Sequence, residues 1–184
     1  MASDKFASRG GEKLQAAINN FQLSVNNLVC LDVGSSTGGF VDCLLQNGAA
    51  KVYSVDTAYG ELAWKLRNDK KVVVMERTNI LYLKELPEKA DLITIDSGWT
   101  KLELVLPVVK AFLKENGQLL ALLKPHYEAD KKDLIKGVLR DDLVEEVKNQ
   151  VLEKVKSLGF EILGEMPSPI LGGGGNKEFL VLLK

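Results

Sequence analysis

Short apolar runs alternate with helix-like segments along most of this 184-residue chain. The strand-like runs are residues 28–33, 51–55, 72–75, 92–95, 118–123, 160–163 and 179–183. The helix-like segments, with apolar residues three or four positions apart, are 37–47, 101–114 and 142–158. The first five runs are apolar at nearly every position, which is typical of strands buried on both faces. The alternation favours an α/β fold with a mostly parallel sheet and helices on both faces.

The carboxyl-terminal part departs from this pattern. The runs 160–163 and 179–183 are separated by Pro167, Pro169 and a glycine run at 172–175, with no room for a helix. We therefore expect a β-hairpin with a long glycine-rich loop, which makes the last of seven strands antiparallel to the others. This ending resembles the Rossmann-like fold of class I methyltransferases and differs from most nicotinamide-binding Rossmann domains. Residues 1–184 are expected to form one domain.

Composition narrows the class of protein. Apolar residues make up 46% of the chain and the formal net charge is −1, so any nucleic-acid surface must be a local patch. The sequence has no apolar run long enough to span a membrane, and its first residues lack a signal-peptide core. We expect a cytoplasmic protein in which Cys30 and Cys43 are reduced, buried thiols. A metal site is not expected, because one His and two Cys lack ligand spacing.

A glycine-containing loop follows the first strand-like run and opens a helix. Its glycines let the backbone approach a ligand closely. Asp56 lies 22 positions after Gly34, at the end of the second run, where a carboxylate can accept hydrogen bonds from ribose hydroxyls. Asn79 follows the third run and can meet an adenine edge. The predicted cofactor-binding residues are Gly34, Ser35, Ser36, Thr37, Gly38, Gly39, Phe40, Asp56, Thr57, Asn79 and Asp96.

The loop geometry fits either S-adenosylmethionine or NAD. Ser36 occupies the second glycine position of the Gly-x-Gly-x-x-Gly pattern that cradles a pyrophosphate. Because S-adenosylmethionine carries no phosphate, this departure favours it over NAD.

Four ionisable residues fall where such a fold points side chains at one cleft. Asp96, Lys124 and Glu178 lie at the ends of predicted strands, and Lys13 lies in the helix that precedes the sheet. Two amines and two carboxylates beside a cofactor can turn a hydroxyl group into a nucleophile.

Several segments are similar to the hemolysin A (TlyA) type of FtsJ-like ribosomal RNA 2′-O-methyltransferases. They are residues 8–14 (Ser-Arg-Gly-Gly-Glu-Lys-Leu), 31–40, 60–69, 74–79, 124–125, 167–170 and 176–180. The resemblance covers nearly the whole chain. It implies a catalytic Lys–Asp–Lys–Glu tetrad at Lys13, Asp96, Lys124 and Glu178. It also implies S-adenosylmethionine as the cofactor, with Asp56 on its ribose, and ribosomal RNA or a ribosomal subunit as the partner.

Two features depart from the family pattern. Members carry an S4-type RNA-binding domain ahead of the segment that begins at Ser8, and only seven residues precede Ser8 here. We therefore expect this chain to lack that domain. A Val-Ser-Phe-like stretch usually follows the catalytic Asp, whereas this chain has Ser97-Gly98-Trp99. Because that stretch borders the substrate cleft, the cofactor is better predicted than the substrate.

Lys124 has two possible roles in such a site. It is either the base that takes the hydroxyl proton or a charged group that stabilises the developing alkoxide. Burial and the charge of Lys13 favour the neutral amine, whereas Asp96 and Glu178 favour the ammonium, so the sequence leaves both roles open. His126 is expected to pack at the rim of the pocket.

The predicted substrate-binding residues are Arg9, Lys65, Arg77 and Trp99. The three cations belong to the densest basic group, and Lys131, Lys132 and Lys136 form a second group. Trp99 either stacks on an unpaired base or covers the edge of the core. Two other functions remain open: a methyltransferase-like module that binds the cofactor with a lost or different substrate, and an NAD-dependent oxidoreductase. The oligomeric state is unknown from the sequence.

Overall fold

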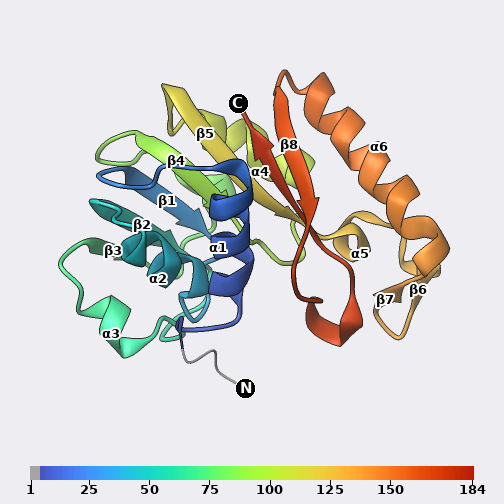
Figure 1. The fold of residues 1–184 in the computed structure, drawn as a ribbon, viewed down its shortest axis with the longest axis horizontal. Helices are drawn as coiled ribbons and strands as arrows, with labels where there is room; N and C mark the ends of the chain where they lie inside the picture. The colour runs from blue at the N-terminus through green and yellow to red at the C-terminus, as the bar shows by residue number, and fades with distance from the viewer. Residues whose placement is uncertain (1–4) are drawn as a thin grey trace.

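The computed structural model describes residues 5–184, which are built around one seven-stranded sheet of order β3-β2-β1-β4-β5-β9-β8 (Figure 1). Its strands are β1 Val29–Val33, β2 Lys51–Val55, β3 Val72–Met75, β4 Ala90–Ile95, β5 Leu113–Leu123, β8 Ile162–Pro167 and β9 Phe179–Leu183. Strands β1 to β5 pair in parallel, and β9 pairs antiparallel with both β5 and β8. The predicted mostly parallel sheet with an antiparallel last strand is therefore confirmed.

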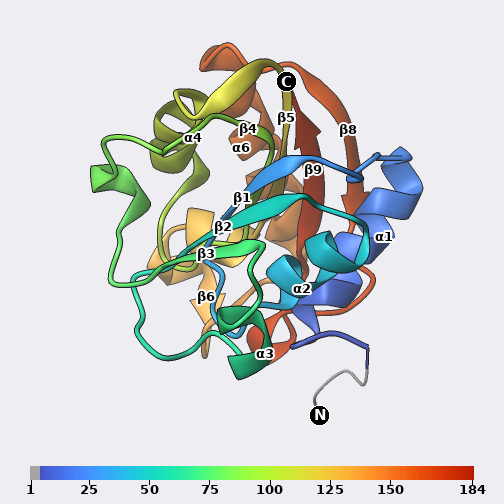
Figure 2. The same ribbon diagram turned by 90° about the vertical axis from the view of Figure 1, so that its left-hand side faces the viewer.

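Helices cover both faces of the sheet, as the alternating sequence predicts. They are α1 Gly10–Phe21, α2 Gly39–Gln46, α3 Trp64–Arg67, α4 Leu102–Lys110, α5 Pro125–Glu128 and α6 Val144–Ser157. Figure 2 shows α1 and α2 on one side of the sheet and α4 and α6 on the other. Each side has its own apolar core, one centred on buried residues of α4 and α6 and the other on those of α1 and α2. Within residues 5–184, no helix is long and apolar enough to cross a membrane.

Three predicted elements have other boundaries in the structure. The predicted helix 101–114 ends at Lys110, and β5 starts at Leu113 instead of residue 118. The early start pairs Leu113 with Ala90, ahead of a register shift, and residues 114–116 are exposed, so apolar periodicity gives no sign of them. The strand predicted at 160–163 lies at 162–167 instead. It can include Pro167 because β8 is the edge strand, where a missing N–H leaves no ladder bond unmade.

A small hairpin between α5 and α6 was not predicted. Its strands are β6 Leu134–Ile135 and β7 Val138–Leu139, joined by a two-residue turn. Lys136 (φ 51°) and Gly137 (φ 83°) both occupy the left-handed region, as tight hairpin turns of this length require. Short 3₁₀ turns occur at Ile80–Tyr82, Lys131–Asp133, Asp141–Leu143 and Gly173–Gly175.

The fold gathers the predicted site residues at one edge of the sheet. Because β1, β2, β4 and β5 are parallel, the residues that follow them (Gly34, Asp56, Asp96 and Lys124) lie at the same carboxyl edge. Strand β9 runs the opposite way, so Glu178, which precedes it, reaches that same edge.

Candidate active site

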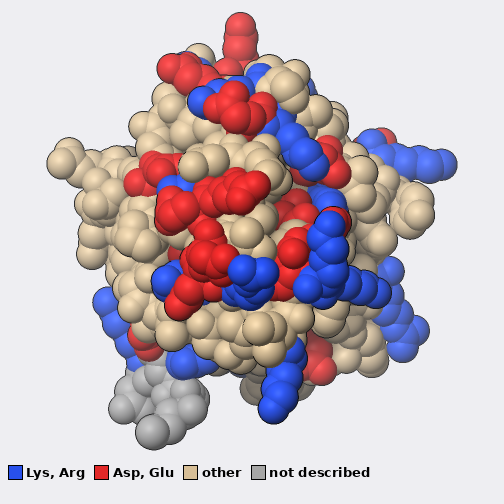
Figure 3. Space-filling view, turned by 90° about the vertical axis from the view of Figure 1, so that its right-hand side faces the viewer, with Lys and Arg blue, Asp and Glu red and all other residues tan. Residues whose placement is uncertain are grey.

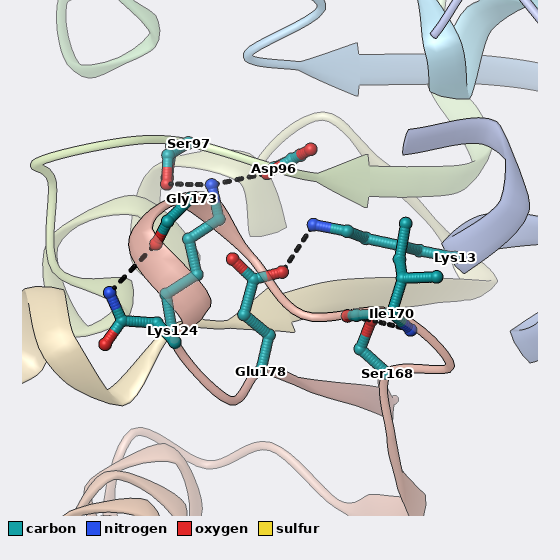
Figure 4. A network of polar contacts seen from close by, with 9 residues as sticks. Lys13, Asp96, Ser97, Lys124, Ser168, Ile170, Gly173 and Glu178 are labelled. Carbon is teal, nitrogen blue, oxygen red and sulfur yellow. Dashed lines mark hydrogen bonds and ion pairs between the residues drawn. The ribbon is translucent and has the colours of Figure 1, made fainter. Parts of the chain in front are cut away.

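The four predicted catalytic residues form two ion pairs at the carboxyl edge (Figure 4). Lys124 Nζ lies 2.5 Å from Asp96 Oδ1, and it also donates to the backbone oxygen of Ser97 at 3.4 Å. Lys13 Nζ donates to Glu178 Oε2. Two cations and two carboxylates therefore lie together, although the chain separates them widely.

Strand register explains why these side chains meet. Leu123 of β5 pairs with Phe179 of β9, so the next position along the antiparallel ladder sets Lys124 beside Glu178. Asp96 follows β4, the parallel neighbour of β5. Lys13 lies on the buried face of α1 and is only 9% exposed, which turns its amine toward the sheet edge rather than toward water.

Two cavities flank the loop that follows β1, each of about 240 Å³. The first is lined by Ser8, Arg9, Gly10, Lys13, Ser35, Thr37, Gly39, Phe40, Ile170, Gly172 and Gly173. The second is lined by Val33, Val55, Asp56, Thr57, Thr78, Asn79, Ile80, Ser97, Gly98, Trp99 and Thr100. Gly34, Ser36 and Asp96 line both, so one ligand that passes over this loop can occupy the two cavities.

The loop is shaped by close backbone contacts. Gly34 has φ 84°, and a Cβ there would lie 2.6 Å from the backbone oxygen of Asp96. The backbone N–H of Ser36 donates to Asp56 Oδ2 at 2.7 Å, and Asp56 Oδ1 accepts from the backbone N–H of Ala58. Asp56 therefore holds the loop and still presents carboxylate lone pairs to the second cavity.

Two of the predicted cofactor-binding residues contact other parts of the protein. Gly38 faces Leu62 and Leu66, because a Cβ there would overlap the Leu66 side chain, and it lines neither cavity. Asn79 lines the second cavity, but its side-chain oxygen accepts from the backbone N–H of Leu81. The amide nitrogen of Asn79 takes no part in that bond, and the prediction that Asn79 meets an adenine edge rests on it.

The charges of the cavities discriminate between cofactors. Asp56 and Asp96 are the ionisable residues that line the second cavity. Asp56 suits the ribose hydroxyls of either cofactor. Asp96, which lines both cavities, suits the sulfonium charge of S-adenosylmethionine, whereas it would repel the pyrophosphate of NAD. The residues present therefore fit S-adenosylmethionine better than a dinucleotide.

Asp32, which the sequence analysis did not single out, lies under the loop. It is fully buried in β1, where its Oδ1 accepts from Thr94 Oγ1 at 2.6 Å and its Oδ2 has no protein partner. Burial raises the pKa of this carboxyl to about 7, with smaller contributions from Asp96 and Asp56. The signal available in the sequence was an acidic residue inside an otherwise apolar run at 28–33.

Aromatic side chains form one rim of the site. Trp99 is 87% exposed and has φ 62°, a strained value for a large side chain. Its ring lies 5.0 Å from that of Tyr127, and the Lys124 amine lies 5.6 Å from the Tyr127 ring. The exposure of Trp99 shows that it does not cover the core, which leaves its face free for a ligand.

His126 is buried against Tyr127, in agreement with the predicted packing role. Burial lowers its pKa to about 4, and the charges of Lys124 and Lys13 act in the same direction. The imidazole is therefore neutral at physiological pH.

The predicted substrate-binding cations lie in different settings. Arg9 lines the first cavity. Lys65 pairs with Asp42 at 2.7 Å, and Arg77 stacks 4.2 Å above the Tyr59 ring; neither lines either cavity. Arg77 and Lys65 can therefore contact only parts of a substrate that extend beyond the cavities.

The face that carries α6 is less suited to nucleic acid. Figure 3 shows acidic and basic side chains intermingled there. Several form ion pairs, including Lys148 with Glu145 and Lys154 with Glu103. Within residues 5–184, no group of three His, Cys, Asp or Glu side chains could hold a metal ion.

Residues 6–184 match the FtsJ-like methyltransferase family. The chain is 44% identical to YqxC of Bacillus subtilis (strain 168), named as a candidate rRNA methyltransferase, over 97% of this chain and 66% of that protein. It is 36% identical to the 16S/23S rRNA (cytidine-2′-O)-methyltransferase TlyA of Mycobacterium tuberculosis (strain ATCC 25618 / H37Rv), over 97% of this chain and 68% of that protein.

The chain is also similar to a protein of solved structure. A candidate hemolysin from Lactococcus lactis superposes with a TM-score of 0.94 at 42% identity, over 98% of this chain and 89% of that chain. The chain spans about two thirds of the length of the two curated relatives, at 66% and 68%.

Proposed function

The chain belongs to the FtsJ-like methyltransferase family, and on this premise we propose that it transfers a methyl group from S-adenosylmethionine to a ribose 2′-hydroxyl of ribosomal RNA. The observation that carries the proposal is the meeting of two lysine–carboxylate pairs beside the loop of residues 34–40. That arrangement activates a hydroxyl group, which an electrophilic methyl donor alone does not do.

S-adenosylmethionine supplies a methyl group that its sulfonium charge has already activated. Asp56 would accept hydrogen bonds from the ribose hydroxyls of the cofactor, and Asn79 would contact the adenine edge. Gly34, Ser36 and Asp96 line both cavities, so they would hold the middle of the cofactor. Arg9 and Lys13 are the cations that line the first cavity, and because Lys13 is paired with Glu178, Arg9 is the one that suits the carboxylate group of the cofactor.

Lys124 would act on the 2′-oxygen of the acceptor ribose. In methyl transfer the oxygen–carbon bond forms, the sulfur–carbon bond breaks and the hydroxyl proton leaves. Lys124 Nζ either receives this proton or, as an ammonium, stabilises the charge that develops on the oxygen. Asp96 orients Lys124 through their ion pair, and Lys13 and Glu178 position the ribose.

Two observations support RNA as the substrate. Aromatic and basic side chains surround the site, and the chain is similar to an rRNA methyltransferase. Trp99 offers an exposed ring at the rim, and bases that are unpaired stack well on such rings. Of the predicted substrate-binding cations, Lys65 and Arg77 lie outside the cavities, where the phosphate backbone would run. A ribosomal substrate would also give the protein a cytoplasmic location.

The test is methyl transfer to separated ribosomal subunits. The protein is incubated with S-adenosylmethionine carrying a labelled methyl group and with purified small or large bacterial subunits. The rRNA is then digested, and its nucleosides are identified by mass spectrometry. We expect a 2′-O-methylated nucleoside in one or both subunits, and its base will identify the target nucleotide.

Calorimetry with S-adenosylhomocysteine and with NAD distinguishes the proposed function from the two alternatives, a cofactor-binding module and an NAD-dependent oxidoreductase. Binding of S-adenosylhomocysteine without methylation of either subunit would favour a cofactor-binding module with another substrate. Binding of NAD in its place would favour an oxidoreductase and would contradict the proposal.

A further inference from the structure

Asn176 is a buried polar residue near the site that has no role in the mechanism above. It lies between the glycine segment 172–175 and β9 and is only 4% exposed. Its Oδ1 accepts from the backbone N–H of Leu139 at 3.0 Å. Its Nδ2 donates to the backbone oxygens of Gly137 at 3.0 Å and Gly173 at 3.1 Å. A buried amide with three such bonds fixes the backbone around it.

These bonds hold the glycine segment in a closed loop. The backbone oxygen of Asn176 accepts from the N–H of Gly172 at 2.8 Å, while its side chain holds Gly173. Gly172 lies directly against the Glu178 carboxylate, because a Cβ at this position would overlap Glu178 Oε1. Figure 4 shows Glu178 between the segment that carries Gly173 and the amine of Lys13. The loop therefore confines the carboxylate on the side opposite its cation.

The same amide joins two distant parts of the chain. Gly137 and Leu139 belong to the hairpin formed by β6 and β7, which follows Lys124 by way of α5. Strands of two residues are marginal by themselves, so the hairpin needs a partner to hold it. Asn176 thus ties the segment that follows Lys124 to the segment that precedes Glu178.

We propose that Asn176 is a positioning residue for methyl transfer: through Gly173 and Gly172 it holds Glu178 in the orientation that pairs with Lys13. This inference rests on the proposed function, since the rate of methyl transfer is its main readout. Asn176 itself lines neither cavity and would touch neither substrate nor cofactor.

The experiment compares two Asn176 variants with an independent variant and a neighbouring control. Asn176→Asp keeps the bond from Leu139 and loses both donors, and Asn176→Ala loses all three bonds. Gly172→Ala pushes on the Glu178 carboxylate directly, with an ordinary backbone conformation for alanine. Lys177→Ala is the control, because Lys177 pairs with exposed Asp141 at the surface.

We expect kcat to fall about 30-fold in both Asn176 variants and in Gly172→Ala, because a small misplacement of a reacting group costs up to about 100-fold. The KM for rRNA should stay within about twofold in these variants. The Kd for S-adenosylhomocysteine should stay within about twofold in the two Asn176 variants, because Asn176 lines neither cavity, and Lys177→Ala should match the wild type. Because all three changes act on the same carboxylate, Gly172→Ala should add little to Asn176→Ala.

Three results would overturn the proposal: an unchanged kcat in Asn176→Asp, a rise in KM in place of the fall in kcat, or fully additive effects of the two sites. If Asn176→Ala does not fold, Asn176→Asp and Gly172→Ala carry the same test. If the wild type transfers no methyl group, the proposed function fails on its own. The 13Cδ chemical shift of Glu178 then judges Asn176: it should move in Gly172→Ala and in Asn176→Asp, and an unmoved shift would refute the positioning role.

Discussion

The two ion pairs of the site differ in what surrounds them. The Lys124–Asp96 pair joins the ends of neighbouring parallel strands, with 14% and 23% of the side chains exposed. The Lys13–Glu178 pair joins residues 165 positions apart, with 11% and 3% exposed. Asp96 lines both cavities, whereas Glu178 is covered by Gly172. The Lys124–Asp96 pair, called the open pair below, can therefore form new contacts with a substrate. The Lys13–Glu178 pair, called the covered pair, is held in place by the protein around it.

The largest expected effect is on the open pair. Lys124→Ala should lower the rate of methyl transfer about 10²- to 10⁴-fold, because general acid–base or electrostatic groups of this kind make contributions of that size. The Kd for S-adenosylhomocysteine should change little, since Lys124 lines neither cavity beside the loop. Single-turnover kinetics measure the rate of methyl transfer, and calorimetry measures the Kd. A variant that still turns over within tenfold of the wild type would remove Lys124 from the mechanism.

The pH dependence of this rate distinguishes the two roles of Lys124. A neutral base gives a rate that rises with pH until the amine has lost its proton. A charged stabiliser gives a rate that falls as the ammonium is lost. His126 should add no inflection between pH 5 and 8, because its pKa is lowered to about 4.

Asp32 offers a third case, a buried carboxyl without a cation. Its folded pKa of about 7 exceeds the unfolded value of 3.8, so between these values the folded state binds the extra proton. Stability should therefore fall as pH rises from about 4 to 7. Asn in place of Asp32 removes this penalty, so Asp32→Asn should be more stable than the wild type at pH 8 by up to roughly 4 kcal/mol, with little difference at pH 4. Urea unfolding at both pH values measures this, and an equal gain at both would contradict it.

The covered pair should matter for stability. Lys13→Ala leaves the Glu178 carboxylate buried without its cation, which costs about 3 kcal/mol in the free energy of unfolding. Lys51→Ala is the matched control, because Lys51 and Glu88 form a pair with 41% and 40% exposure and should lose less than about 1 kcal/mol. Denaturant titration measures both variants. Equal losses in the two would mean that burial does not distinguish the pairs.

The smallest effect is expected at the rim beside the open pair. Trp99→Ala should raise the KM for rRNA about tenfold, since stacking of one base on an aromatic ring contributes about 1–3 kcal/mol. Trp99→Phe retains a ring and should recover most of the affinity. Filter binding measures the affinity for RNA, and steady-state kinetics measure the KM. If Trp99→Ala binds RNA as well as the wild type, the exposed ring has no part in substrate binding.

Much of the sheet was predictable because its strands are short and apolar throughout. β2, β3 and β9 begin and end at the predicted residues, and the antiparallel direction of β9 followed from the absence of a helix before it. The strand-end rule then placed Asp96 and Lys124 together, since parallel neighbours end at one edge. The Lys13–Glu178 pair was expected from the family resemblance, which places both residues in the tetrad.

Other features depend on contacts that leave no local pattern. The bonds of Asn176 reach back 37 and 39 positions to the hairpin, and neither periodicity nor spacing reports such a contact. The exposed start of β5 lacks the apolar run that marks its buried end. The surroundings of Lys65 and Arg77 were unpredicted for the same reason: a basic cluster in the sequence says nothing about which carboxylate or ring each cation will contact.

The insertion of β9 between β5 and β8 also sets an order of assembly. The hydrogen bonds that tie the start of the loop of residues 34–40 to the end of β2 lie within residues 29–56, whereas the Lys13–Glu178 contact must close a chain segment of 165 positions. Closing a longer segment costs more chain entropy, and distant contacts form more slowly than nearby ones. As the chain leaves the ribosome, we therefore expect the loop to take shape first and the buried lysine–glutamate contact to form among the last.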